Sequence, residues 1–231
     1  MKLSVLTLTY RRHELLRECL HSYLANKDSE SEMVIINDDP ETEYRCDIPG
    51  VKVVNLDTRL SSLGKKLEYA FGQCSGEYIY RLDDDDLLTS WGLKQVREMI
   101  AENPGFDIYR SKASYFYNNN TYKGVKSNVN NGNCYHEQWV RDIDIPDISI
   151  GEDLELTFRS GGKIYTSQSN KHTMIYRWGM PTCHISALGA QHHANNPYLF
   201  GKVDERLGKT AGVIELTPKE HNYEQQIINT L

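Results

Sequence analysis

Four consecutive aspartates, residues 83–86, have the type and spacing most suited to chemistry, and they directly follow a strand-like run at 77–82. Adjacent carboxylates repel each other, by about 3 kcal/mol for a pair ~5 Å apart at an effective dielectric near 20. A fold that holds them at the end of a buried strand must therefore neutralise them. Oxygen ligands suit Mg²⁺ or Mn²⁺, so we predict a divalent cation here. The alternative is a solvated acidic turn before a helix that starts near Thr89-Ser90.

A second acidic element, Glu152-Asp153, follows Gly151 and opens an amphipathic stretch that Gly161-Gly162 ends. A carboxylate in this position can accept a proton from a substrate hydroxyl. It can equally be an acidic first helical turn, which the helix dipole favours whatever the function. The residues alone leave both interpretations open.

The elements that must position these carboxylates alternate along the first hundred residues. Apolar, β-branched runs predict strands, and helical spacing of apolar residues predicts helices between them. The expected strands cover 2–9, 33–36, 51–54 and 77–82, and the expected helices cover 11–26, 60–73 and 90–102. This alternation predicts an α/β domain with a mostly parallel sheet, whose ligands bind beyond the carboxyl ends of the strands. Polar clusters at 9–11, 38–39 and 83–86 follow such ends.

After residue 105 the pattern changes to short strands and turns. Segments 106–117 and 121–126 flank Asn118-Asn119-Asn120, which predicts a hairpin and hence a small antiparallel β region. A short helix is expected near 136–141, and strands at 163–166 and 173–178. The tail predicts a C-terminal helix from Thr217, since Thr217 and Glu220 match a capping box and Pro218 suits the first helical position. Residues 179–212 show no regular pattern.

The composition narrows the class of protein. A chain of 231 residues can form one domain with a sizeable core. The net charge is -6 and no run of Lys or Arg occurs, which disfavours a polyanionic partner. The five cysteines are scattered and form no CxxC pair, as in a reduced cytosolic protein. Since we see neither a leader pattern nor an apolar stretch long enough for a membrane span, we expect a cytoplasmic location.

The order of these clusters resembles the inverting glycosyltransferases of family 2, which adopt the GT-A fold. The matching stretches are 4–10, 34–39, 64–66, 76–79, 82–86 and 151–153. The sequence departs from the family pattern at Pro40-Glu41, where a Gly-Ser is common, and the last 50 or so residues match no family element. The resemblance implies a single GT-A domain over 1–231. Its nucleotide-sugar-binding half covers about 1–105, and its acceptor-binding half with a C-terminal tail covers about 106–231.

The resemblance also implies a metal-dependent transfer of a sugar from a nucleotide-diphosphate donor, expected to be a UDP-sugar, to an acceptor hydroxyl. Asp153 would be the catalytic base and Glu152 would orient the acceptor. Donor binding is expected from Thr9, Tyr10, Arg11, Asp38, Asp39, Lys65, Lys66, Asp83 and Asp84. Mn²⁺ or Mg²⁺ would be held directly by Asp85, Asp83 would face the ribose or reach the metal through water, and His184 would be a further metal or phosphate ligand.

Each assignment has a structural alternative. Asp38-Asp39 can be a strand-ending turn, and the pair Lys65-Lys66 a solvated helix face. Asp84 or Asp86 can cap the next helix. A single histidine such as His184 is commonly structural.

The acceptor also remains open. A saccharide or a lipid-linked glycan is the first expectation, and a hydroxylated base in DNA, as in phage-type enzymes, is the second. Two further hypotheses for the function are a nucleotidyltransferase and a non-catalytic module that binds sugar nucleotides. The first disagrees with residues 9–12, where a Gly-rich phosphate loop would be expected, and the second would not need Asp153.

Overall fold

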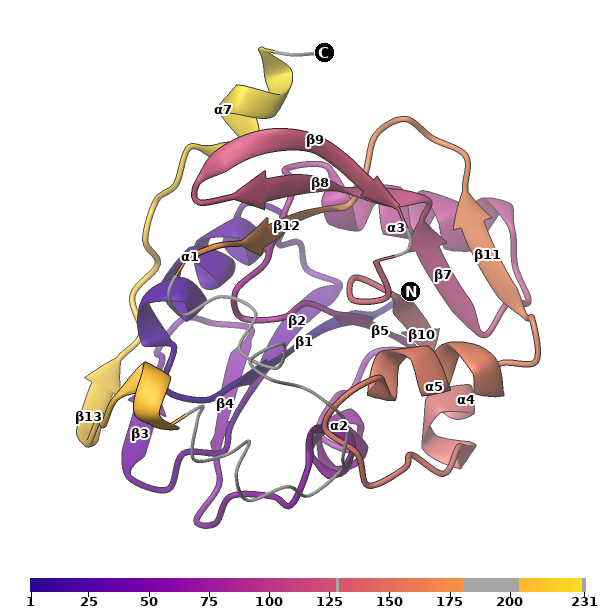
Figure 1. Ribbon diagram of the computed structural model, residues 1–231. Helices are drawn as coiled ribbons and strands as arrows, with labels where there is room; N and C mark the ends of the chain where they lie inside the picture. The colour runs from indigo at the N-terminus through magenta and orange to yellow at the C-terminus, as the bar shows by residue number, and fades with distance from the viewer. Residues whose placement is uncertain (128, 181–203, 230–231) are drawn as a thin grey trace.

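Strands and helices alternate in the computed structural model as the sequence pattern predicts (Figure 1). The structure describes residues 1–127, 129–180 and 204–229. The elements are β1 (Leu3–Thr9), α1 (His13–Leu24), β2 (Ser31–Asn37), β3 (Thr42–Arg45), β4 (Val51–Asn55), α2 (Leu63–Phe71), β5 (Tyr78–Arg81), β6 (Leu87–Leu88), α3 (Gly92–Glu102), β7 (Ile108–Ser111), β8 (Ala113–Asn118), β9 (Thr121–Ser127), β10 (Cys134–His136), α4 (Glu137–Asp142), α5 (Glu152–Arg159), β11 (Ile164–Ser167), β12 (Met174–Trp178), β13 (Gly212–Glu215) and α7 (Tyr223–Ile228). No helix in these described ranges has the length and apolarity that crossing a membrane requires.

The main sheet has seven strands in the order β11-β7-β10-β5-β1-β2-β4. Strand β1 pairs in parallel with β2 and β5, and β2 pairs in parallel with β4. Only β10 among these strands runs antiparallel to its neighbours. Because β1, β2 and β5 are adjacent and parallel, their carboxyl ends meet at one edge of the sheet. The three polar clusters that follow them are thereby brought together.

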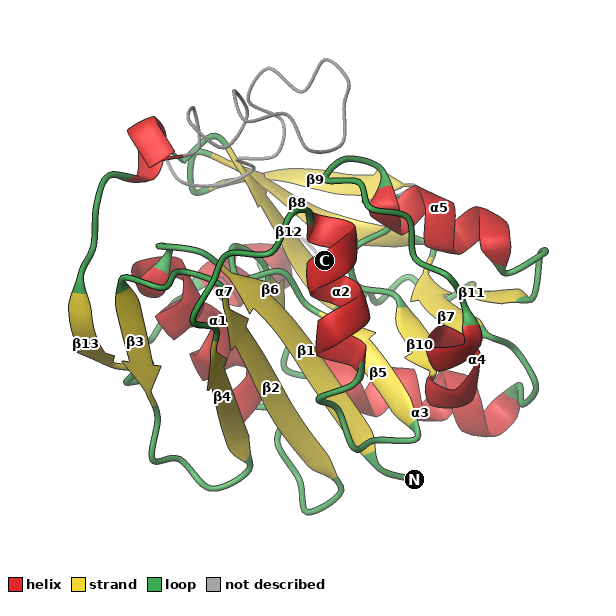
Figure 2. Cartoon of the chain, turned by 90° about the horizontal axis from the view of Figure 1, so that it is seen from below, coloured by secondary structure: helices red, strands yellow, loops and turns green. Residues whose placement is uncertain are grey.

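Helices cover both faces of this sheet, as Figure 2 shows. Residues of β1 alternate between the faces, because successive side chains of a strand point in opposite directions. Leu3 and Val5 belong to the core under α1 and α3, whereas Leu6 and Leu8 belong to the core under α2 and α4. All four are at most 5% exposed. This two-sided burial explains the unbroken apolar run of the first strand.

A smaller sheet has the order β6-β12-β8-β9 and lies above the edge where the polar clusters meet (Figure 1). Strands β8 and β9 form the expected antiparallel hairpin. Asn119 and Asn120 form its turn with φ values of 49° and 59°, the left-handed geometry that suits a two-residue hairpin. Strand β12 adds in parallel to β8, and β6 pairs antiparallel to β12. Since β6 begins at Leu87, the four aspartates connect the two sheets.

The C-terminal helix is present but shorter than the sequence predicts, since α7 begins at Tyr223 and not after Thr217. Thr217 does not cap a helix. Its hydroxyl and carbonyl oxygens each accept a hydrogen bond from Arg17 of α1, at 2.9 Å, and the Lys219 amide donates to the Arg17 carbonyl. The contact with α1 thus uses the groups that a capping box would need. A further pairing of β3 with β13 joins residues 170 positions apart in the sequence, and no local pattern predicted it.

Candidate functional site

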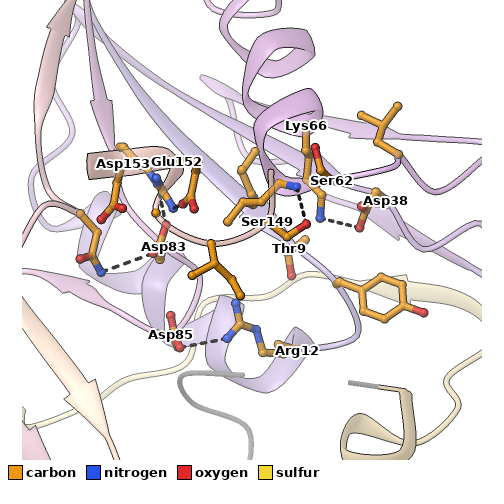
Figure 3. A pocket seen from close by; sticks show the side chains of 18 of the residues that line it. Thr9, Arg12, Asp38, Ser62, Lys66, Asp83, Asp85, Ser149, Glu152 and Asp153 are labelled. Carbon is orange, nitrogen blue, oxygen red and sulfur yellow. Dashed lines mark hydrogen bonds and ion pairs between the residues drawn. The ribbon is translucent and has the colours of Figure 1, made fainter. Parts of the chain in front are cut away.

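A cavity opens at the carboxyl edge of the main sheet, where the structure brings the predicted clusters together (Figure 3). The loop after β1, the first turn of α2, the aspartate loop 83–86 and the first turn of α5 supply most of its lining. Leu207, from a short helical turn at 204–207, and Tyr176 of β12 complete it. The position agrees with the general rule for open α/β sheets.

The Asp38 carboxylate and Lys66 form one end of the cavity. Asp38 is 2% exposed, and its Oδ1 lies 2.7 Å from Lys66 Nζ. Lys66 reaches this position because α2 begins at Ser62, whose hydroxyl accepts a hydrogen bond from the Lys65 amide. Lys65, by contrast, points outward and pairs with Glu68. Only one of the two predicted lysines therefore lines the cavity.

The Gly64 position fixes the spacing between α2 and the loop that leads into α5. A Cβ on Gly64 would overlap the Pro146 carbonyl oxygen, and the Gly64 amide donates to the Ile148 carbonyl at 2.8 Å. Only glycine permits this approach. The contact holds residues 149–153 against the cavity.

Tyr10 forms a second wall together with Arg59, and Asp204 holds Tyr10 from outside the lining; the sequence reasoning missed both Arg59 and Asp204. The Tyr10 hydroxyl donates to Asp204 Oδ1 at 2.7 Å, and the Arg59 guanidinium lies 3.8 Å from the centre of the Tyr10 ring. Burial raises the pKa of Tyr10, and the bond to Asp204 acts in the same direction. Neighbouring Arg11 instead faces Asp39, at 3.0 Å, and neither residue lines the cavity.

The four aspartates divide into separate environments. Asp83 is the most exposed of them and accepts from Arg81 Nε at 3.0 Å. Asp84 is fully buried and pairs with Arg12, whose Nε donates to Asp84 Oδ2 at 3.1 Å. Arg12 Nη1 also lies 2.9 Å from Asp85 Oδ2. The carboxylates are therefore already partly neutralised by arginines.

Asp86 has a different environment, in which each of its oxygens accepts a hydrogen bond from an uncharged donor. The Arg177 amide donates to Asp86 Oδ1 at 2.9 Å, and Asn131 Nδ2 donates to Oδ2 at 2.8 Å. Burial raises the pKa of Asp86, and it raises that of Asp84 to about 7, although Arg12 opposes the latter shift. The sequence reasoning named a divalent cation and did not include these neighbours. Arginine side chains supply part of the positive charge.

One oxygen from each of Asp83, Asp85 and Asp86 lies within 4.8 Å of the others. Three carboxylate oxygens suit a hard divalent cation such as Mg²⁺ or Mn²⁺, so the residues present fit such an ion. Asp84 takes no part in this group and does not line the cavity, because its side chain turns toward Arg12. His184, the third predicted ligand, lies outside the described residues.

Glu152 and Asp153 stand at the start of α5, after Gly151 with its φ of 77°. Glu152 is 5% exposed and accepts from Arg81 Nη2 at 2.9 Å. Burial raises the pKa of Glu152, with Arg81 opposing the shift. Asp153 is only partly buried, and it lines the cavity (Figure 3). The two neighbours therefore differ: one is locked in an ion pair, and the other can meet a ligand.

Arg81 is the most informative residue that the sequence reasoning passed over. It is 4% exposed and bridges Asp83 and Glu152, and so it joins the aspartate loop to α5. Its position, two residues before the first aspartate of the loop, was the available signal. Of the predicted site residues, the structure brings together around the cavity Thr9, Tyr10, Asp38, Lys66, Asp83, Asp85, Glu152 and Asp153, and it leaves Arg11, Asp39, Lys65 and Asp84 out of the lining.

The parallel sheet, the acidic connection to a second sheet and the cavity at their junction define a GT-A-type fold. A family model described as glycosyl transferase family 2 matches residues 4–158. The chain belongs to that family.

Among solved structures, the chain is similar to TarS of Staphylococcus aureus. With the TarS 1–349 complex of UDP-GlcNAc, the TM-score is 0.61 at 23% identity, over 77% of this chain and 58% of the other. With the UDP complex of the same TarS fragment, the TM-score is 0.61 at 21% identity, over 90% of this chain and 71% of the other. At these identities the likeness shows the shared fold.

Among curated sequences, TarS is described as a poly(ribitol-phosphate) beta-N-acetylglucosaminyltransferase and is 32% identical over 113 residues. That match covers 45% of this chain and 19% of TarS. An uncharacterized glycosyltransferase of Haemophilus influenzae is 29% identical over 129 residues, which is 52% of this chain and 48% of the relative. The chain therefore matches half or less of the length of these relatives.

Proposed function

We propose that this chain transfers a sugar from a UDP-sugar to an acceptor hydroxyl, by a single displacement that inverts the anomeric centre. One observation carries this proposal: a single cavity is lined by Asp38, by the aspartate loop and by Asp153. Such a reaction needs one group to bind the nucleobase, a second to bind the diphosphate and a third to take the proton of the acceptor hydroxyl.

At the nucleotide end, the Asp38 carboxylate is placed to accept a hydrogen bond from a base N–H, which uracil offers. Lys66 Nζ lies 2.7 Å from this buried carboxylate and forms an ion pair with it. Tyr10 and Thr9 form the adjoining wall. A site built around a hydrogen-bond acceptor discriminates well against bases that lack the matching donor.

At the diphosphate, Asp83, Asp85 and Asp86 would hold Mg²⁺ or Mn²⁺ through the oxygens that lie within 4.8 Å of one another. When bound, such a cation acts as a Lewis acid and offsets the charge that develops on the departing diphosphate. We therefore propose that the transfer depends on a divalent metal.

At the acceptor, Asp153 removes the proton from the attacking hydroxyl. It is the partly exposed member of its pair, whereas Glu152 is held by Arg81 at 2.9 Å and can orient the acceptor or the base. The link from Glu152 through Arg81 to Asp83 holds the first turn of α5, which carries the catalytic base, at a fixed position relative to the aspartate loop. Such positioning is worth a large part of a catalytic barrier.

For the donor, UDP-GlcNAc is the first candidate, because a TarS complex with it shares this fold. For the acceptor we propose a hydroxyl of a saccharide, a polyol-phosphate chain or a lipid-linked glycan. The four cysteines in the described part carry free thiols, which supports a reducing, cytoplasmic location.

Calorimetric titration with UDP, in the presence and absence of Mn²⁺, tests the donor site. We expect binding that Mn²⁺ strengthens at least tenfold, and release of UDP from UDP-GlcNAc when an acceptor is added. CDP serves as the control, since cytosine offers no ring N–H at the corresponding position. Equal binding of CDP and UDP, or no binding of either, would count against the proposal.

A further inference from the structure

Arg12 connects the aspartate loop to the wall of the cavity. It stands directly before α1, its side chain is 16% exposed, and it belongs to the cavity lining. Its guanidinium pairs with Asp84 through Nε, at 3.1 Å. It also pairs with Asp85 through Nη1, at 2.9 Å (Figure 3). The first-loop residues expected at the donor from the sequence were 9–11, and Arg12 was not among them. Arg12 nevertheless holds a carboxylate that a cation would use.

Asp85 therefore has two competing partners. With Asp83 and Asp86 it forms the group whose oxygens can surround a divalent cation. The same carboxylate lies at hydrogen-bond distance from the positively charged guanidinium of Arg12. A cation bound there and a guanidinium on the same group repel each other, and the repulsion is strong where water is largely excluded. Asp85 is the one carboxylate that both positive charges would share, and a further anion that contacts both of them would remove this competition.

The diphosphate of a nucleotide sugar is such an anion. A guanidinium offers a planar fork of donors that matches phosphate oxygens, and it binds them more strongly than neutral groups do. Arg12 can turn from Asp85 toward the cavity that it already lines. Asp84, fully buried, is the partner that it would keep through Nε. No bond is formed or broken, and only ionic partners change.

We propose that Arg12 pairs with Asp85 until a divalent cation and the donor diphosphate bind, and that it then exchanges Asp85 for the diphosphate. This inference rests on the proposed function and adds a diphosphate-binding residue to it. Because the exchange needs both the cation and the diphosphate, the two ligands bind cooperatively. By thermodynamic linkage, each raises the affinity of the other by the same factor.

Calorimetric titrations of Mn²⁺ alone, UDP alone and each in the presence of the other test the exchange. In the wild type we expect weak binding of Mn²⁺ alone and at least tenfold tighter binding once UDP is present. In Arg12→Gln, Mn²⁺ alone binds at least fivefold tighter, because Asp85 is released. UDP in the presence of Mn²⁺ binds at least fivefold more weakly, and the factor by which each ligand raises the affinity for the other becomes smaller. Arg17→Gln removes the same charge from α1 without touching an aspartate of the loop, and it should match the wild type.

Arg12→Lys guards against misfolding of the glutamine variant, since it keeps the charge but replaces the planar fork of guanidinium donors with a single ammonium group. It should change both affinities in the same directions by smaller factors. The exchange is overturned if the Arg12 variants bind Mn²⁺ alone no tighter than the wild type does, because Arg12 would then only hold the loop. A wild type that binds Mn²⁺ but not UDP would overturn the proposed function itself. A wild type that binds both, with unchanged Arg12 variants, overturns the exchange alone.

Discussion

The two halves of the cavity are assembled by different means. The nucleotide side comes from the carboxyl ends of β1, β2 and β5, which are neighbours in one parallel sheet. The acceptor side comes from a segment that returns over a long distance, the loop before α5, which packs on Gly64. The first side is therefore placed by strand order, and the second by individual side-chain and backbone contacts.

This difference predicts how each side responds to substitution. Residues at strand ends are held by the whole sheet, so changing one should affect ligand contacts more than the fold. Residues on the returning segment depend on a few contacts, such as the Arg81 bridge to Asp83 and Glu152. Altering one such contact should disturb catalysis while nucleotide binding survives.

The sharpest separation of the two sides should come from Asp153→Asn. An amide cannot accept the acceptor proton, so we expect kcat to fall by about 10³-fold or more, within the range for loss of a general base. The Kd for UDP should change less than twofold, because Asp153 lies on the acceptor side. Glu155→Gln, on the same helix and paired with Arg159, is the matched control. Full activity in Asp153→Asn would show that another group is the base.

Gly64→Ala should disturb the junction of the two sides. The added methyl group would meet the Pro146 carbonyl and push the loop before α5 away from α2. Overpacking of this kind costs about 1–3 kcal/mol in stability. We expect a lower melting temperature and a fall in kcat that exceeds the loss of UDP affinity. Gly72→Ala, at the other end of α2, lacks a comparably close contact, and equal effects of the two substitutions would contradict the interpretation.

The same contrast explains what the sequence could predict. The apolar runs and the helical spacing of apolar residues predicted β1, α1, β2 and β5 to within a few residues. They could do so because the strand period and the helix period both depend on local spacing. The convergence of Asp38 and the aspartate loop followed from parallel strands alone. That Lys66 and not Lys65 faces the cavity needed the start of α2, which Ser62 sets.

What escaped prediction depends on distant partners. The Arg12 side chain pairs with Asp84 from 72 residues away, and the Arg177 side chain, 92 residues away, donates to the Asp85 carbonyl oxygen. The early helix expected from Thr217 fails because Arg17, 200 residues away, binds the same groups. Such contacts leave no periodic signal. A buried acidic run should, however, prompt a search for arginines next to its strand and at the start of the neighbouring helix.

The two adjacent lysines of α2 offer a smaller but cleaner test of the nucleotide side. Lys66→Gln removes the partner of buried Asp38, and we expect UDP to bind about tenfold more weakly, a difference of ~1.4 kcal/mol. Lys65→Gln removes the same charge from the exposed side, where Glu68 is its partner, and should change the Kd less than twofold. Calorimetry of both variants measures the contrast. Equal losses would mean that general charge, and not the contact with Asp38, attracts the nucleotide.

The smallest predicted effect concerns the C-terminal tail, which folds back to contact α1. Burial lowers the pKa of His221 to about 4, and His21 beside it acts in the same direction. The unfolded chain takes up this proton near pH 6.5, so stability should fall as the pH drops from about 6.5 to 4 and then level off. After allowance for partial exposure, the expected loss is about 1 kcal/mol. Urea unfolding of wild type and His221→Phe across this range should show a flatter pH profile for the variant, and parallel profiles would mean that His221 is not the titrating group.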